Sequence, residues 1–174
     1  RSQVKFLMVG LTGALTAIGA ALADTKVEVK GVHLCCGACV KGVGKALAGI
    51  EGVKAKCDQE AGTVTITADT DTAAGKALAA LGSAGYYGET GDAKLSVPAA
   101  KAPKGTVSSV TVEGIHNCCR SCCVAIKDAI KTVKGVKTDT AAPKATKFEV
   151  TGDFQAADLV KALNAAGFQV TVSP

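Results

Sequence analysis

Two short stretches of the sequence collect six of its eight cysteines. Residues 33–39 read HLCCGAC and residues 116–122 read HNCCRSC, so both follow the pattern His-x-Cys-Cys-x-x-Cys. Thiolates are soft ligands that favour Cu(I), Zn(II) and similar ions. The clustering therefore indicates soft-metal binding first, and thiol redox chemistry second.

The Cys-x-x-Cys pairs of the two stretches are the principal candidate ligands. They are Cys36 with Cys39, and Cys119 with Cys122. Apolar residues at helical spacing follow each stretch, which places each pair at the start of a predicted helix. Unpaired backbone N–H groups and the helix dipole stabilise a thiolate at such an end.

The remaining loop residues could complete a larger ligand set. A third sulfur from Cys35 or Cys118 would permit trigonal coordination, and His33 or His116 would add the nitrogen of a Cys3His set suited to zinc. Adjacent residues of an extended chain point in opposite directions, so Cys35 and Cys36 can share an ion only if the loop curls. For the two histidines, hydrogen bonding within the loop is the alternative role.

The other two cysteines are expected to pack rather than bind. Cys57 has no cysteine counterpart in the second half, and Cys123 falls on the core position that Val40 holds in the first. A disulfide framework also fits poorly, because such frameworks spread their cysteines to close long loops.

Residues 1–23 have the pattern of a secretory signal. Arg1 and Lys5 precede an apolar stretch that starts at Phe6 and ends in Ala21-Leu22-Ala23, which predicts cleavage before Asp24. An uncleaved membrane anchor is the alternative. We expect an exported protein, in a bacterial periplasm or secreted.

Charge and composition exclude several classes of function. The formal net charge of +5 falls to +3 without the two positive charges of residues 1–23, and Trp is absent. This charge is too small and too dispersed for nucleic-acid binding. Nor does the sequence show a carboxylate pair or phosphate-binding glycine motif, so we do not expect an enzyme.

The sequence repeats itself at a shift of 83 residues, which becomes 82 toward the end of each copy. The cysteine stretches coincide, and Ala84-Gly85-Tyr86 falls on Ala166-Gly167-Phe168. Each copy has the pattern strand-helix-strand-strand-helix-strand, with Asp71 and Asp153 as expected N-caps of the second helices. This order predicts an α+β fold of two ferredoxin-like βαββαβ domains, each a four-stranded antiparallel sheet covered by two helices.

The expected organisation follows from the repeat. Residues 24–92 form the first domain, residues 93–105 form a linker rich in Pro, Ala and Lys, and residues 106–174 form the second domain.

Both copies resemble the heavy-metal-associated domain. The resemblance rests on a strand ending in Gly-apolar-x, on Cys-x-x-Cys at the start of the first helix, and on Ala-Gly-aromatic before the fourth strand. That family includes copper chaperones and periplasmic mercury-binding proteins. It implies a soft-metal site at each Cys-x-x-Cys pair, with Tyr86 and Phe168 nearby. The loops differ from the usual Gly-Met-x-Cys-x-x-Cys by two extra residues and by Val32 or Ile115 in place of Met.

Three functions fit these observations. The first is a non-catalytic protein that carries or sequesters Cu(I), or else Zn(II) or Hg(II), with one site per domain. Its partner would be a metal-transporting membrane protein or another metal-binding domain. The alternatives are a thiol-disulfide redox protein using the Cys-x-x-Cys pairs, and an interaction module stiffened by structural Cys3His zinc.

Overall fold

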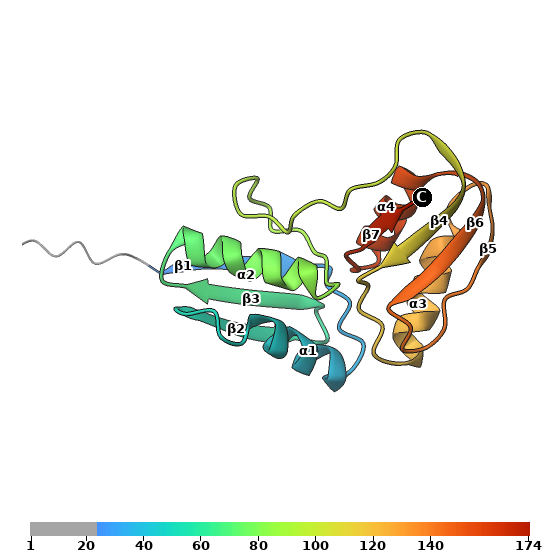
Figure 1. Cartoon of the computed structure of the whole chain (residues 1–174). Helices are drawn as coiled ribbons and strands as arrows, with labels where there is room; N and C mark the ends of the chain where they lie inside the picture. The colour runs from blue at the N-terminus through green and yellow to red at the C-terminus, as the bar shows by residue number, and fades with distance from the viewer. Residues whose placement is uncertain (1–23) are drawn as a thin grey trace, which may run out of the picture.

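The computed structural model describes residues 24–174, so the predicted signal segment lies outside the described residues. Two α+β domains lie side by side, and a long connection runs between them (Figure 1). The first contains β1 (Thr25–Lys30), α1 (Gly37–Leu47), β2 (Val53–Asp58), β3 (Thr63–Ala68) and α2 (Asp71–Ser83). The second contains β4 (Thr106–Glu113), α3 (Arg120–Lys131), β5 (Val136–Asp139), β6 (Lys147–Gln155), α4 (Ala156–Ala165) and β7 (Thr171–Ser173).

The sheets confirm the predicted fold class. Strand order is β1-β3-β2 in the first domain and β5-β6-β4-β7 in the second, and all pairs are antiparallel. Alternate residues of β1 and β4 are buried, as a strand with one covered face requires, and they pack against the helices. The second sheet has the four strands that we expected.

The first sheet has three strands rather than four. The expected last strand after Tyr86 is reduced to one bridge between Lys30 and Glu89, closed by two backbone hydrogen bonds of 2.8 and 2.9 Å. Pairing cannot extend further because the residues before the bridge contact the second domain, and Gly91 (φ 73°) follows directly after Thr90.

The N-caps of the second helices also differ from the prediction. Thr70, not Asp71, caps α2, and its hydroxyl accepts a 3.1 Å hydrogen bond from the Ala73 N–H. In the second domain β6 runs through Asp153 and Gln155 becomes the N-cap of α4, without a side-chain cap bond. Strand pairing between Thr106 and Gln155 extends β6 past the aspartate.

Residues 93–105 form no helix or strand, yet they contact both domains. Val97 is buried in the core, and the Gln169 side chain of the second domain donates a hydrogen bond to the Pro98 carbonyl. The connection therefore lies against the domains that it joins.

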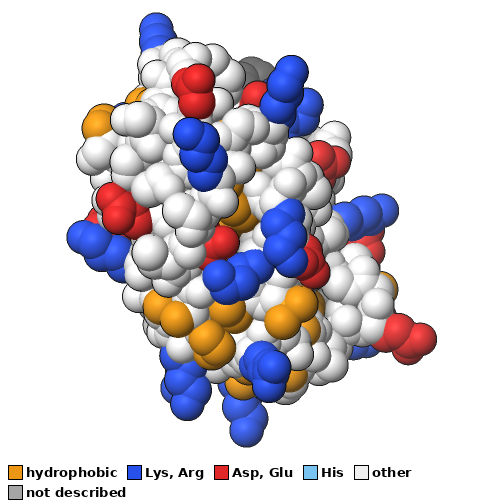
Figure 2. All heavy atoms as spheres, turned by 90° about the vertical axis from the view of Figure 1, so that its right-hand side faces the viewer, with side chains coloured by type: hydrophobic (Ala, Val, Ile, Leu, Met, Phe, Trp, Pro, Cys, Tyr) orange, Lys and Arg blue, Asp and Glu red, His pale blue; other side chains and the backbone are white. Residues whose placement is uncertain are grey.

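The surface of the second domain carries charges of both signs, intermingled (Figure 2). None of the helices in the described part of the chain has the length and apolar character that crossing a membrane requires.

Candidate metal centre

The cysteine pairs lie at helix N-termini, as the sequence predicts. Cys36 and Cys119 are the N-cap residues of α1 and α3, and both have extended backbone, with φ −158° and ψ 168° at Cys36 and φ −149° and ψ 175° at Cys119. Cys39 and Cys122 lie in the first turns and are buried, whereas Cys36 and Cys119 are half-buried. The Cys36 and Cys119 sulfurs each contact other loop cysteines, which places both among the candidate ligands.

The structure brings the two loops together, so that all six loop cysteines form one cluster. Within each domain, Cys36 and Cys39 lie 3.8 Å apart and Cys119 and Cys122 lie 3.6 Å apart, sulfur to sulfur. Between domains, Cys39 and Cys122 lie 3.8 Å apart and Cys36 and Cys119 lie 4.0 Å apart. Cys35 and Cys118 complete the cluster, and each contacts the Cys-x-x-Cys pair of the opposite domain. The loops that we assigned to separate sites are therefore neighbours.

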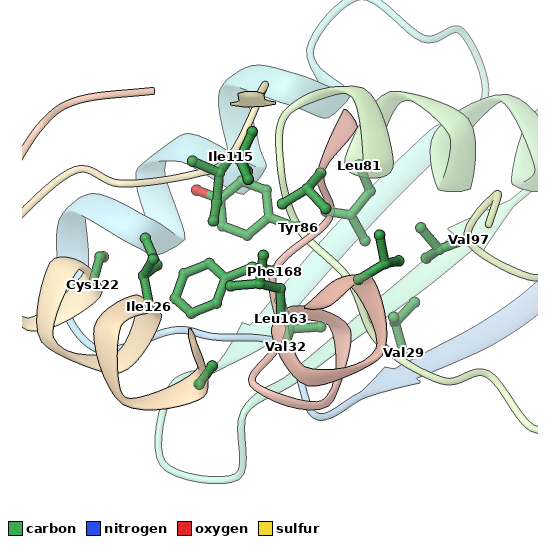
Figure 3. Close-up of a cluster of buried hydrophobic side chains, with 14 of the residues drawn as sticks. Val29, Val32, Leu81, Tyr86, Val97, Ile115, Cys122, Ile126, Leu163 and Phe168 are labelled. Carbon is green, nitrogen blue, oxygen red and sulfur yellow. The ribbon is translucent and has the colours of Figure 1, made fainter. Parts of the chain in front are cut away.

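Residues 85–87 and 167–169 hold the domains together with pseudo-twofold symmetry. Tyr86 and Phe168 form an antiparallel bridge, and the two rings lie close together in the buried cluster of Figure 3. The Gly167 carbonyl accepts hydrogen bonds from the backbone of Tyr87 (3.1 Å) and His33 (3.5 Å). In the symmetric place, the Gly85 carbonyl accepts from Gln169 (3.0 Å) and His116 (3.4 Å).

The close approach of the domains requires glycine at 85 and 167. Both have positive φ, 85° and 87°, a conformation that side chains rarely adopt. A Cβ at 85 would also overlap the His116 backbone N and lie 2.5 Å from the Gly114 carbonyl oxygen, and a Cβ at 167 would overlap the His33 N. The sequence marks these glycines as helix ends; their second role, as docking points, was not predicted.

Each loop histidine stacks on the aromatic residue of the opposite domain. The rings of His116 and Tyr86 have centroids 4.2 Å apart, and those of His33 and Phe168 lie 4.5 Å apart. The Tyr86 hydroxyl donates to the Cys39 carbonyl (2.8 Å) and lies 3.2 Å from Nε2 of His116. Because its one proton goes to the carbonyl, the tyrosine oxygen accepts from Nε2, which leaves Nδ1 of neutral His116 as an acceptor.

Both histidines are held in the neutral form that can bind a metal. Burial lowers the pKa of His33, and burial together with the charge of His33 lowers the pKa of His116 to about 4. A ring nitrogen of His116 lies within 4.8 Å of the Cys39, Cys118 and Cys122 sulfurs. His33 lies within the same distance of Cys35 and Cys122, so both predicted histidines border the cluster.

Burial and hydrogen bonding shift the pKa values of the loop cysteines in opposite directions. Burial raises the pKa of Cys35 and of Cys118, and the hydrogen bonds that each makes to neighbouring sulfurs raise it further. A backbone hydrogen bond from Cys122 lowers the pKa of Cys119 to about 6. Thiolate is thus present beside thiols that can release a proton when a cation arrives.

Cys57 and Cys123 lie outside these sulfur contacts. Cys57 is in β2, where burial raises its pKa, and Cys123 is buried in α3. Cys57 packs against the core as a half-buried residue, and a packing role for Cys123 stays a prediction.

The first domain matches a known family model over residues 26–87, that of the heavy-metal-associated domain. This match supports a function in metal binding, and it confirms the predicted resemblance over residues 26–87. The second domain has the same element order, and its cysteine loop lies at the equivalent helix end.

Two solved structures share a weaker likeness with the chain. The solution structure of the N-terminal soluble domains of Bacillus subtilis CopA is 16% identical, covers 87% of this chain and 95% of its own, and has a TM-score of 0.34. The crystal structure of the first two RRM domains of the yeast poly(U)-binding protein Pub1 is 11% identical, covers 86% and 98%, and has a TM-score of 0.24. At these scores neither likeness bears on fold or function. No curated protein matches the chain in sequence.

Proposed function

We propose that the chain binds Cu(I), or a similarly thiophilic ion, through its loop cysteines and carries or sequesters it outside the cytoplasm. The observation that carries this proposal is the gathering of six thiols, 3.5 to 4.0 Å from their neighbours, at the N-termini of α1 and α3. The heavy-metal-associated family of residues 26–87 supports it.

The donor set favours Cu(I) over harder ions. Among the described residues, the groups that could hold an ion contain six sulfurs and two imidazoles and no carboxylate. Such a soft donor set disfavours Mg(II) and Ca(II). Zn(II) and Hg(II) are also thiophilic and remain the alternative cargoes.

The exposure of the cysteines fits a metal that is exchanged with a partner. Cys39 and Cys122 are buried, while Cys36 and Cys119 are partly open to solvent. A thiol of the partner could replace a half-buried ligand before the buried ligand dissociates from the metal. We propose a metal-transporting membrane protein or another metal-binding domain as this partner, and an exported location through the signal segment of residues 1–23.

A structural zinc ion is the second candidate, because one ring nitrogen and three sulfurs meet at the interface. They belong to Cys39, Cys118, Cys122 and His116, which is a Cys3His set drawn from both domains. In that case the domains would separate or unfold on chelation, whereas a carrier keeps its fold without cargo.

A competition titration tests the proposal. The reduced protein is titrated anaerobically with Cu(I), and separately with Zn(II), against a chromophoric chelator, and circular dichroism is recorded with and without metal. We expect Cu(I) to be taken from the chelator by the wild type, less effectively by Cys36→Ser/Cys119→Ser, and not by the variant in which Cys36, Cys39, Cys119 and Cys122 are all serine, while the control Cys57→Ser behaves as wild type.

Two results would contradict the carrier function. Tight binding of Zn(II), together with loss of structure when a chelator removes it, would favour the structural module. If neither ion is retained, the redox alternative becomes the leading one, and a reduction potential in the range of thiol oxidoreductases would support it.

A further inference from the structure

We propose that each Cys-x-x-Cys pair binds its ion together with a third thiol supplied by the opposite domain. Cys118 completes the site of Cys36 and Cys39, and Cys35 completes the site of Cys119 and Cys122. This rests on the proposed function, and it adds the ligand set, the number of ions and the coupling between the domains.

Two triangles of sulfurs carry the proposal. In the first, Cys118 lies 3.9 Å from Cys36 and 3.6 Å from Cys39, which are themselves 3.8 Å apart. In the second, Cys35 lies 3.5 Å from Cys119 and 3.5 Å from Cys122, which are 3.6 Å apart. The pseudo-twofold symmetry of the interface exchanges the two triangles.

This is the one division of the six sulfurs into two separate triangles whose sides are all contacts of 4.0 Å or less. Other closed triangles exist, for example Cys35, Cys39 and Cys122. Each of those leaves a remainder that includes two adjacent cysteines, Cys35 with Cys36 or Cys118 with Cys119, and neither adjacent pair is in contact. The two triangles that each include one thiol of the opposite domain therefore use all six thiols, and no thiol belongs to both.

The backbone explains why the third thiol comes from the other domain. Cys36 and Cys119 have extended φ and ψ, so the side chain before each points away from its neighbour. Cys35 therefore does not contact Cys36, and it reaches Cys119 and Cys122 across the interface as well as Cys39 of its own domain. In the same way Cys118 contacts Cys36 and Cys39 of the opposite domain as well as Cys122 of its own. The sequence had indicated Cys35 and Cys118 as third ligands, with this alternation as the obstacle; docking of the domains removes the obstacle.

The triangles are close to the size that a metal ion needs. A metal–sulfur bond of about 2.3 Å, the value for zinc thiolates, requires sulfurs about 4.0 Å apart in a planar site and slightly less in a pyramidal one. The observed 3.5 to 3.9 Å calls for outward shifts of a few tenths of an ångström or less. The N-termini of α1 and α3 both face the cluster, and their dipoles offset part of its negative charge.

Metal protection of cysteines tests the arrangement in the full chain. The background variant Cys57→Ala/Cys123→Val keeps only the six loop cysteines, and valine is what the first domain has at the position of Cys123. The reduced protein is loaded with two Cu(I) per chain and treated with an alkylating agent, and each cysteine is then scored by peptide mass spectrometry. Cys35→Ser and Cys118→Ser are compared with the background, and Cys35→Ala and Cys118→Ala repeat the test without a hydroxyl.

We expect protection to be lost across the interface. Cys35→Ser should expose Cys119 and Cys122 at least tenfold more than Cys36 and Cys39, and Cys118→Ser should do the reverse. Circular dichroism of the metal-free variants checks that they fold; a variant that does not fold is replaced by its alanine counterpart.

Three results would overturn the inference while leaving the proposed function intact. Exposure of the pair in the same domain would show that the third thiol acts in cis. Unchanged protection would show that the pairs need no third thiol, and equal exposure of all four would show a single shared cluster. Failure of the background protein to gain any protection would instead overturn the proposed function itself.

Discussion

The two domains, which the sequence predicts to be copies of one unit, have different aromatic residues beside the cysteine cluster. In the first copy the hydroxyl of Tyr86 fills space beside Gly42, where a Cβ would overlap it. In the second copy Phe168 replaces the tyrosine, and Ala125 stands at the position that corresponds to Gly42. The hydroxyl of one copy is thus matched by a methyl group in the other.

The consequence of this exchange appears at the histidines. His116 bonds through Nε2 to the Tyr86 hydroxyl, whereas Nε2 of His33 is buried beside Phe168 without a hydrogen-bond partner. The side chain of His116 is therefore held by a hydrogen bond, whereas the equivalent side chain of His33 is not. The comparison shows that the cysteines of the repeat keep one geometry while the supporting residues diverge.

The largest expected effect comes from the docking glycines, which the two copies share. Gly85→Ala or Gly167→Ala should cost at least about 2 kcal/mol each, because a positive φ and overlap with the opposite backbone combine. Chemical denaturation measures the loss, and small-angle scattering should show a larger radius of gyration as the domains part. The control Gly75→Ala, in α2 with open space around it, should be neutral or slightly stabilising. Equal stability of Gly85→Ala and Gly75→Ala would contradict the docking role.

The pair of Gly42 and Tyr86 should behave as a coupled unit. Gly42→Ala alone displaces the hydroxyl and should cost about 1–3 kcal/mol. Tyr86→Phe alone leaves Nε2 of His116 unpaired and should cost about 1–2 kcal/mol. The double variant reproduces the residues of the second copy, so its cost should be smaller than the sum of the two. Strict additivity in the denaturation free energies would refute the coupling.

The reverse exchange in the second copy should have a smaller effect. Phe168→Tyr alone should destabilise, since Ala125 occupies the space of the new hydroxyl. Phe168→Tyr/Ala125→Gly should recover that loss and add about 0.5–1.5 kcal/mol by giving Nε2 of His33 a partner, less the cost of a helical glycine. Because only the second change makes room, a stabilised single variant would argue against this account. Nitrogen chemical shifts of His33 would report the new bond.

The smallest effect is expected at the second helices, which are capped in one copy only. Thr70→Ala removes the bond to the Ala73 N–H and should cost about 1 kcal/mol. Gln155→Ser offers α4 a cap that it lacks, at the loss of the exposed hydrogen bond that Gln155 donates to the Thr106 hydroxyl, and should stabilise by about 0.5 kcal/mol. Thermal unfolding of the two variants provides the measurement, and opposite signs are the expected outcome.

The repeat made most of the fold predictable. The alternation of β1, the helical spacing after each loop and the shift of 83 residues indicate two α+β domains, and the structure has them. The prediction failed where contacts with residues distant in the sequence determine the ends of a strand or helix. The fourth strand of the first domain is shortened by contacts to the second domain, and α4 starts later because β6 continues its pairing with β4.

The cysteines that form the cluster were also identifiable from the sequence, but their arrangement between the domains was not. Residue types and spacing identify Cys36, Cys39, Cys119 and Cys122, and the helix ends position them. The sequence of one loop does not predict that the other loop packs against it. The sequence does contain one signal of the interface: Gly85 and Gly167 each precede a buried aromatic residue. Their role is recognisable only in the structure, where the backbone of the opposite domain lies too close to either glycine for a Cβ.

X-ray absorption at the copper edge, on the reduced protein loaded with two Cu(I) per chain, tests most directly whether the loops bind metal jointly. We expect three sulfur ligands for each ion, and two in the variant Cys35→Ser/Cys118→Ser. Two sulfurs for each ion in both proteins would show that the Cys-x-x-Cys pairs act alone, and would contradict the joint site.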